Sequence, residues 1–309
     1  MMNERPLVSV VLLSYNRPRL LRDALDSVCS QSYENVEVIV VDNKSGASDE
    51  IAEIVCGREG VRLIRTSANL GFTGGMNLGA SEAHGRYIYL TEDDIVLAPD
   101  CLSRLVDYAQ TRADTRGFLL APVLYNKRER TIRCAGGELS LGGIFSNKIY
   151  GAGEPDAGQF PEPLDVAFIP GSTVFCELEF FRRMGGFRAD FFMYSEDREL
   201  CLRVVKAGGR ITVVPEAKAY HFEPEDATVH AELEFHILKN FYALYLLHAP
   251  SRVLPEFICR YVFLQLVRSA LGMKRSTVSL LRASWWVARN ARSLLKNRLH
   301  ASHAAHSDI

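Results

Sequence analysis

The chain has 309 residues, of which 48% are hydrophobic and 24% are charged, with a formal net charge of −1. This composition is typical of a folded globular protein and excludes a disordered or fibrous chain. Seven scattered cysteines without a CxxC pair argue against a disulfide framework and a structural zinc site. We therefore expect one large domain with an appendage in the reducing cytoplasm, without a signal peptide or a membrane-spanning run.

Apolar β-branched runs alternate with segments of helical period along the first 125 residues. A parallel sheet covered by helices has this pattern. Strands are predicted at Val8–Ser14, Val36–Val41, Val61–Arg65, Tyr87–Thr91 and Gly117–Tyr125. Helices are predicted at Pro18–Ser30, Ser48–Cys56, Gly75–His84 and Pro99–Thr111. Further along the chain, Cys134–Pro163 is rich in Gly, Pro and Asn. We expect this stretch to form a hairpin and a mobile loop near the ligand-binding site.

Polar side chains follow each of the first four predicted strands at its carboxyl end. One such cluster alone is usually a cap for the next helix or turn. Four in succession instead indicate a binding site, because ligands of α/β sheets collect at the carboxyl edge. The clusters are Ser14-Tyr15-Asn16, Asp42-Asn43, Asn69 to Asn77, and Glu92-Asp93-Asp94.

Two acidic clusters point to chemistry. Glu92, Asp93 and Asp94 end a buried strand, and no basic residue adjoins them in sequence, so we expect a cation to neutralise them. Hard oxygen ligands suit magnesium or manganese carried with a diphosphate, while a solvated acidic turn is the alternative. The second cluster, Glu196-Asp197, opens a predicted helix. Its alternative explanation is ordinary complementarity to the helix dipole.

Six segments, taken in order, resemble the signature of family 2 inverting glycosyltransferases with the GT-A fold: VSVVLLSYNR, VVDNKS, NLGFTGGMNLGA, YLTEDDIVLAPD, PGSTVFCELEFFRRMGGF and FFMYSEDRELCLRVVKAGG. The resemblance covers residues 7–222 and is nearest to bacterial rhamnosyltransferase-like members that build cell-surface polysaccharides. It implies an α/β fold with a GT-A-type nucleotide-binding sheet flanked by helices in residues 1–225. We expect a helical, basic C-terminal extension at 226–300 and a disordered tail at 301–309.

The resemblance also implies a role for each cluster. Ser14, Tyr15, Asp42 and Asn43 match positions that hold the base and ribose of the donor nucleotide, although many relatives carry a second Asp where Asn43 stands. The triplet 92–94 matches the DxD-type motif that holds the ribose and a divalent metal on the diphosphate, with Glu as its first member. The pair 196–197 matches the ED motif, whose Asp is the general base.

Three further positions complete the expected site. Gly171 lies in the segment that usually faces the acceptor, and Asn77 lies in the cluster after the third strand. His221 stands where relatives often have a histidine near the diphosphate, although a lone histidine at a strand end is more often structural. The expected metal ligands are therefore Asp93, Asp94 and His221.

The expected reaction moves a sugar from a UDP- or dTDP-sugar, with rhamnose slightly favoured, to a saccharide or lipid-linked acceptor. Asp197 would remove the acceptor proton, with Glu196 as the fallback base, and the metal would stabilise the leaving diphosphate. A nucleotidyltransferase is one alternative, but SYNRP stands where its Gly-rich phosphate loop would be. A non-catalytic sugar-nucleotide-binding protein is the other, and it would be expected to lose an acid from one of the two clusters, which are both intact.

The C-terminal segment differs in charge from the rest of the chain. Residues 250–309 carry ten Lys and Arg against two Asp and Glu, which leaves 26 against 35 in residues 1–249. No nucleic-acid motif is present, so we expect an anionic membrane surface on the inner leaflet as the partner. A helix over Ser276–Leu299 would have two different sides. The basic side would hold Arg282, Arg289, Arg292 and Lys296, with Trp285 and Trp286 close to it. The opposite, apolar side would hold Leu280, Val287, Ala291, Leu294 and Leu295. The alternative is that this apolar side packs on the catalytic domain or on a second subunit in a homodimer.

Overall fold

A computed structural model of the chain describes residues 5–112, 116–127, 131–142, 145–222, 231–263, 267 and 277–304. Twelve strands are found in this part of the chain. They are β1 (Val8–Ser14), β2 (Val36–Asp42), β3 (Val61–Arg65), β4 (Tyr87–Glu92), β5 (Ile95–Leu97), β6 (Phe118–Asn126), β7 (Ile132–Cys134), β8 (Gly137–Ser140), β9 (Ser146–Ile149), β10 (Leu164–Asp165), β11 (Thr173–Glu177) and β12 (Arg210–His221).

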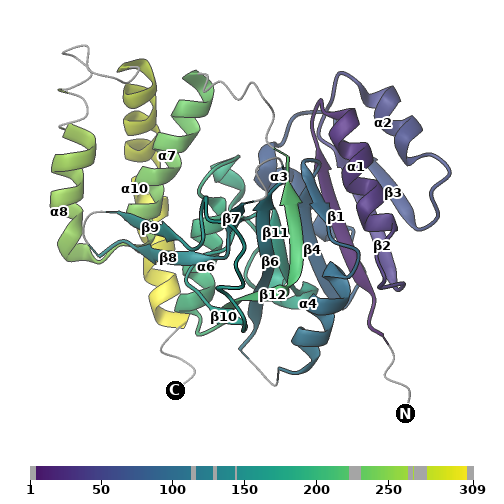
Figure 1. Ribbon diagram of the computed structural model, residues 1–309. Helices are drawn as coiled ribbons and strands as arrows, with labels where there is room; N and C mark the ends of the chain where they lie inside the picture. Colours follow the sequence, from purple (N-terminus) through teal and green to yellow (C-terminus); the bar gives the residue numbers. More distant parts are fainter. Residues whose placement is uncertain are drawn as a thin grey trace.

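Ten of these strands form one central sheet in the order β10-β12-β6-β11-β4-β1-β2-β3, with β5 beside β12 and β7 beside β6 (Figure 1). The hairpin β8–β9 forms a separate two-stranded sheet, as expected for the Gly- and Pro-rich stretch. Helices flank the central sheet and extend beyond it: α1 (Pro18–Cys29), α2 (Ser48–Val55), α3 (Gly71–Ser81), α4 (Cys101–Gln110), α5 (Leu178–Arg183), α6 (Glu196–Lys206), α7 (Ala231–His248), α8 (Leu254–Phe257) and α10 (Thr277–Ala304). Two short 3₁₀ helices, η1 (Ala189–Phe191) and η2 (Ser251–Val253), and a π-helical segment, η3 (Ile258–Phe263), complete the described elements.

The parallel pairing of β1 with β2 and β4 brings the predicted polar clusters to one edge. Ser14 lies opposite Asp42 across the β1–β2 pair, and Leu13 lies opposite Glu92 across the β1–β4 pair. All seven residues of β1 are buried, because this strand lies inside the sheet with apolar contacts on both faces. The predicted arrangement of these strands is therefore confirmed.

The sheet is mixed, whereas the sequence pattern predicts a parallel one. β11 runs antiparallel between β4 and β6, with Thr173 opposite Thr91 and Phe175 opposite Leu120. β11 was not predicted from the sequence, because five residues are too few to show the alternating pattern that distinguishes a strand from a loop. Its position brings the preceding Gly171-Ser172 turn to the same edge as the acidic triplet.

Helix α3 begins four residues before the predicted start at Gly75. One tertiary and one local hydrogen bond hold this start: Asn43 Oδ1 accepts from Leu70 N at 2.8 Å, and Asn69 Oδ1 accepts from Gly71 N at 2.8 Å. The hydrogen bond from the distant Asn43 is not visible in the local sequence pattern that normally marks a helix start.

The C-terminal helices pack against one another and against the catalytic body. α7 and α10 lie side by side, with α8 close to them (Figure 1). Leu280 and Leu294, on the predicted apolar side of α10, are buried, whereas Trp285 is 62% exposed. The apolar side is thus used for packing within the chain, which was the alternative interpretation. None of the described helices is both long and apolar enough to cross a membrane.

The expected domain limits fall partly outside the described residues. The boundary between residues 225 and 226 lies within 223–230, which the structure does not describe. α10 continues to Ala304, four residues into the segment 301–309 that was expected to be a tail. Residues 305–309 of that segment lie outside the described part of the chain.

Candidate active site

The acidic triplet lies where β4 turns into β5, and β1 holds its middle member. Asp93 is 1% exposed, and its Oδ2 accepts from Ser14 Oγ at 2.8 Å and from the backbone N–H of Tyr15 at 3.3 Å. Burial raises the pKa of Asp93 to about 7, and it raises the pKa of Glu92 well above its usual range together with the charge of Asp94. The site therefore concentrates buried carboxylates that favour a nearby cation.

Arg17 supplies a positive charge that the sequence analysis missed. Its guanidinium lies 2.9 Å from Asp93 Oδ1 and 2.7 Å from Asp94 Oδ2, although it is 77 positions away from Asp94 in the chain. No basic residue adjoins the triplet in sequence, but in three dimensions Arg17 does. The β1–β4 pairing causes this contact, because it sets the SYNR segment after β1 beside the end of β4.

His221 also lies beside the triplet. β12 pairs antiparallel with β5, with His221 opposite Ile95, so the imidazole Nε2 is 3.7 Å from Asp94 Oδ2. Asp94 Oδ1 is buried and has no hydrogen-bond partner among the described residues. No group of three His, Cys, Asp or Glu side chains in the described part of the chain forms a complete metal site. Asp94 and His221 still fit magnesium or manganese, which commonly bind through one or two protein ligands and complete their shell with phosphate oxygens and water.

The second acidic pair opens α6, as predicted. A turn with left-handed backbone precedes it, with positive φ at Phe192, Tyr194 and Ser195. Asp197 Oδ1 accepts from the backbone N–H of Arg198 at 2.7 Å. Burial raises the pKa of Glu196 to about 8, and the charge of its neighbour Asp197 adds to this shift. The raised pKa favours the protonated form of Glu196 at neutral pH.

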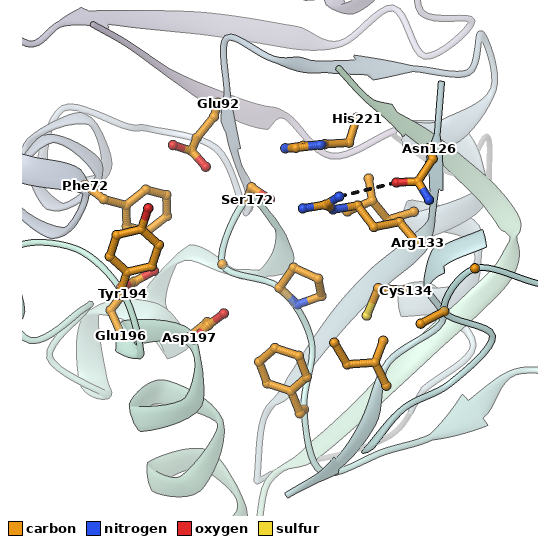
Figure 2. A pocket seen from close by; sticks show the side chains of 17 residues that line it. Phe72, Glu92, Asn126, Arg133, Cys134, Ser172, Tyr194, Glu196, Asp197 and His221 are labelled. Carbon is orange, nitrogen blue, oxygen red and sulfur yellow. Dashed lines mark hydrogen bonds between the residues drawn. The ribbon is translucent and has the colours of Figure 1, made fainter. Parts of the chain in front are cut away.

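One cavity of about 500 Å³ joins the two acidic clusters (Figure 2). In the view of Figure 2, Glu92 and His221 lie toward the top of the cavity, and Glu196 and Asp197 lie below them. Its lining residues come from helices α3 and α6, from strands β4, β6, β7, β9 and β12, and from loops: Phe72, Glu92, Leu124, Asn126, Arg133, Cys134, Ile149, Ala152, Gly153, Phe168, Pro170, Gly171, Ser172, Tyr194, Glu196, Asp197 and His221. The cavity can thus hold a ligand in contact with both carboxylate clusters at once.

Several expected donor-binding side chains are engaged within the fold. Asp42 accepts from Ser45 N and Ser48 Oγ, and so holds the turn after β2. Asn43 donates to Gly71 O at 3.0 Å, and Asn77 pairs with the backbone N–H and carbonyl of Phe187 at 2.9 and 2.7 Å. These contacts position the segments around the site, and neither Asp42, Asn43 nor Asn77 lines the cavity.

Other cavity residues were not singled out from the sequence. Arg133 on β7 and Tyr194 both line the cavity, and Arg133 donates to Asn126 Oδ1 at 3.3 Å (Figure 2). Tyr194 had a signal, because it directly precedes the Ser-Glu-Asp sequence in the FFMYSED segment. The sequence gives no such signal for Arg133, because this residue belongs to a three-residue strand that is defined by its tertiary pairing with β6.

Comparison with solved structures defines the fold class. The fold is similar to that of GalNAc-T7 with UDP, GalNAc and Mn²⁺, with a TM-score of 0.66 and 17% identity over 94% of this chain and 58% of that chain. It is also similar to the mannosyltransferase PcManGT from Pyrobaculum calidifontis in complex with GDP-Man and Mn²⁺, with a TM-score of 0.56 and 17% identity over 98% and 87% of the two chains. The fold is therefore of the GT-A type.

Family models then identify the chain. The model of glycosyl transferase family 2 matches residues 9–133, and that of glycosyl transferase family group 2 matches residues 87–289. The protein belongs to the family 2 glycosyltransferases.

Its curated relatives match only in part. Protein y4gI of Sinorhizobium fredii is 28% identical over 72% of this chain and 25% of its own length. The succinoglycan biosynthesis protein ExoO of Rhizobium meliloti is 33% identical over 38% of this chain and 32% of its length. The putative teichuronic acid biosynthesis glycosyltransferase TuaG of Bacillus subtilis is 30% identical over 38% and 48%. The matched segment spans less than half of each of these relatives.

Proposed function

We propose that this glycosyltransferase moves a sugar from a UDP- or dTDP-sugar, with rhamnose slightly favoured, onto a saccharide or lipid-linked acceptor and inverts the anomeric centre. The proposal rests on the single cavity that Glu92, His221 and Asp197 line together. A donor whose diphosphate lies beside the triplet then has its sugar between the two carboxylate clusters. ExoO and TuaG, by their names, act in succinoglycan and teichuronic acid biosynthesis, which supports a role in the synthesis of a cell-surface polysaccharide.

We assign the donor nucleotide to the edge formed by β1, β2 and β4. Tyr15 is exposed there, and the buried Ser14, Asp42 and Asn43 shape the backbone around it. Glu92 reaches into the cavity, where a carboxylate can accept a hydrogen bond from a ribose or sugar hydroxyl. Asn77 contributes by fixing α3 to Phe187.

We assign a magnesium or manganese ion to Asp94 and His221, with Asp93 behind them. Such an ion, when bound, supplies positive charge to the diphosphate oxygens as the glycosidic bond breaks. Two observations of this chain support the assignment: the partnerless buried Oδ1 of Asp94 and the 3.7 Å approach of His221 Nε2 to Asp94 Oδ2. Arg17 forms ion pairs with both Asp93 and Asp94, and its single positive charge offsets part of their negative charge.

We assign the general base to Asp197. The acceptor hydroxyl attacks the anomeric carbon, its proton passes to the Asp197 carboxylate, and the bond to the diphosphate oxygen breaks with the electron pair on the leaving group. Glu196, with its pKa raised to about 8, holds a proton at neutral pH and is the poorer acceptor. Gly171 leaves room for the acceptor, because a Cβ at this position would lie 3.4 Å from Asp197 Cβ and 3.3 Å from the Phe72 ring.

We propose an anionic membrane surface on the inner leaflet as the docking partner of α10. Val278, Leu281 and Trp285 are exposed on its outward side, and Arg289 and Arg292 continue the same side. An aromatic ring and cationic side chains on one helix face are suited to a lipid headgroup layer. Sedimentation with anionic vesicles tests this: full-length protein should pellet and a Trp285→Ala/Arg289→Ala/Arg292→Ala variant should not, whereas equal recovery in the supernatant would leave α10 as a packing or dimer element.

A donor panel tests the reaction. Thermal shifts with UDP-, dTDP- and GDP-sugars in manganese should single out one donor, because a ligand at 100 times its dissociation constant adds about 2.7 kcal/mol of stability. Product analysis with that donor should give a free nucleoside diphosphate. Release of pyrophosphate would instead support a nucleotidyltransferase, and binding without turnover would support a non-catalytic sugar-nucleotide-binding protein.

A further inference from the structure

The turn that leads into the catalytic pair is held in an unfavourable backbone conformation. Phe192, Tyr194 and Ser195 have φ values of 66°, 69° and 63°, in the left-handed region that non-glycine residues avoid. Such residues persist only where the surrounding structure over-determines them, and they cluster at functional sites. The residues that hold this turn therefore also determine where the first turn of α6 begins.

Helix α7 provides the hydrogen bonds that hold the turn. Asn240 is fully buried, and its Nδ2 lies 2.8 Å from Phe191 O, 2.7 Å from Met193 O and 2.7 Å from Tyr194 O. Because all three partners are carbonyl oxygens, only the amide nitrogen can face them. The adjacent Lys239 adds a contact from Nζ to Asp190 O at 2.6 Å. Two neighbouring residues of α7 thus bind the carbonyls of four of the five residues from 190 to 194.

Apolar contacts support these hydrogen bonds. Phe191 is buried together with Leu247 of α7 and Leu294 of α10. The Phe192 ring stacks on His236 of α7 with 4.7 Å between ring centroids. The turn is therefore packed against the C-terminal extension as well as hydrogen-bonded to it.

The opposite side of the turn contacts the nucleotide-side helix α3. Thr73 N donates to Phe192 O at 3.1 Å. A Cβ at Gly71 would lie 2.4 Å from the same oxygen, so only glycine allows this approach. The turn is thus fixed between α3 on one side and α7 on the other, and Glu196 and Asp197 follow it directly.

We propose that Asn240, assisted by Lys239, is a positioning residue for the general base, so that α7 of the C-terminal extension is an integral part of the active site. The role rests on the proposed assignment of Asp197 as the base. Replacing Asn240 lets the 191–195 turn relax toward negative φ, which moves the start of α6 and the Asp197 carboxylate with it. A base must lie within hydrogen-bond reach of the acceptor hydroxyl, and a misplacement of about 1 Å can lower the rate by about 10²-fold.

The test compares two substitutions at Asn240 with a matched asparagine elsewhere, all in the full-length chain. Asn240→Ala removes the donor, and Asn240→Asp keeps the volume but sets a carboxylate against three carbonyl oxygens. Asn290→Ala is the control, because Asn290 Nδ2 donates to Trp286 O, within its own helix α10. Each protein is measured for hydrogen exchange of the 190–198 amides, for the dissociation constant of the donor's nucleoside diphosphate with manganese, and for kcat with the donor selected by the panel.

Both Asn240 variants should exchange the 190–198 amides about tenfold faster or more and lose about tenfold or more in kcat. Their nucleotide dissociation constants should stay within about twofold of wild type, and Asn290→Ala should match wild type throughout. Unchanged exchange in both Asn240 variants, or a kcat loss matched by an equal loss of nucleotide affinity, would overturn the positioning role. If the wild type transfers no sugar from any donor, the proposed function fails, and the exchange measurement alone decides whether Asn240 holds the turn.

Discussion

Replacing Arg17 with glutamine tests how the fold tolerates three adjacent buried acids. The substitution removes the ion pairs at 2.9 and 2.7 Å to Asp93 and Asp94 while keeping much of the side-chain volume. Breaking a buried pair by removing one partner costs about 3–5 kcal/mol. The Arg17 side chain is 32% exposed, so we expect the lower end of this range, about 3 kcal/mol. At about 2 °C per kcal/mol for a chain of this size, the melting temperature should fall by about 6 °C in EDTA at pH 8.

The pH dependence of this loss follows from Asp93. Burial raises its pKa to about 7 and Arg17 opposes that shift, so the pKa should rise further in the variant. The folded state then binds a proton that the unfolded chain releases, and stability falls as the pH rises. The loss of stability in the Arg17→Gln variant, relative to wild type, should be smallest near pH 5, where Asp93 is protonated in both proteins. This loss should grow as the pH rises through 7.

Differential scanning fluorimetry in EDTA and in manganese with a nucleoside diphosphate measures both effects. Manganese with a nucleoside diphosphate should reduce the difference in melting temperature between the Arg17→Gln variant and wild type, because the ion can replace the missing positive charge. Arg58→Gln is the matched control, since Arg58 pairs at 2.6 Å with the exposed Asp26 and should lose less than about 1 kcal/mol at any pH. If the melting temperature of the Arg17→Gln variant at pH 8 lies within about 1 °C of the wild-type value, the view that Arg17 stabilises the triplet is refuted.

Three further substitutions test the site and its supports. Asp94→Ala should abolish the manganese dependence of nucleoside diphosphate binding in calorimetry, and unchanged affinity with unchanged metal dependence would contradict its role as a ligand. Asp197→Asn keeps the shape but cannot accept the proton, so transfer should fall by about 10²-fold or more with donor binding retained; more than about a tenth of the wild-type rate would exclude Asp197 as the base. Gly71→Ala should destabilise the protein by more than about 2 kcal/mol in urea unfolding, because its Cβ would lie 2.4 Å from Phe192 O at a φ of +69°. Gly57→Ala, at a φ of +76° with nothing within 4 Å, should show only the backbone strain of about 1 kcal/mol, and equal losses in the two variants would contradict the steric explanation.

The sequence alone determined the parallel strands β1, β2 and β4 and the position of the acids that follow them. β1, β2 and β4 contain the apolar runs Val10–Leu13, Val38–Val41 and Tyr87–Leu90, because a strand buried on both faces carries mostly apolar side chains. The polar residues that end them stand at one edge, because parallel strands align their carboxyl ends. Such features depend on local periodicity, which a single sequence displays directly.

Only the tertiary structure decided which distant groups complete the site. Arg17 neutralises acids 77 positions away, β11 inserts antiparallel beside β4, and Asn240 binds a turn that lies 46 to 49 positions earlier. None of these pairings leaves a period in the sequence, because each depends on how loops return the chain to the sheet. The contact from α7 to the turn shows the reason most plainly: the left-handed backbone at Tyr194 and Ser195 is locally unfavourable, and only packing by a helix outside the sheet makes it the stable conformation.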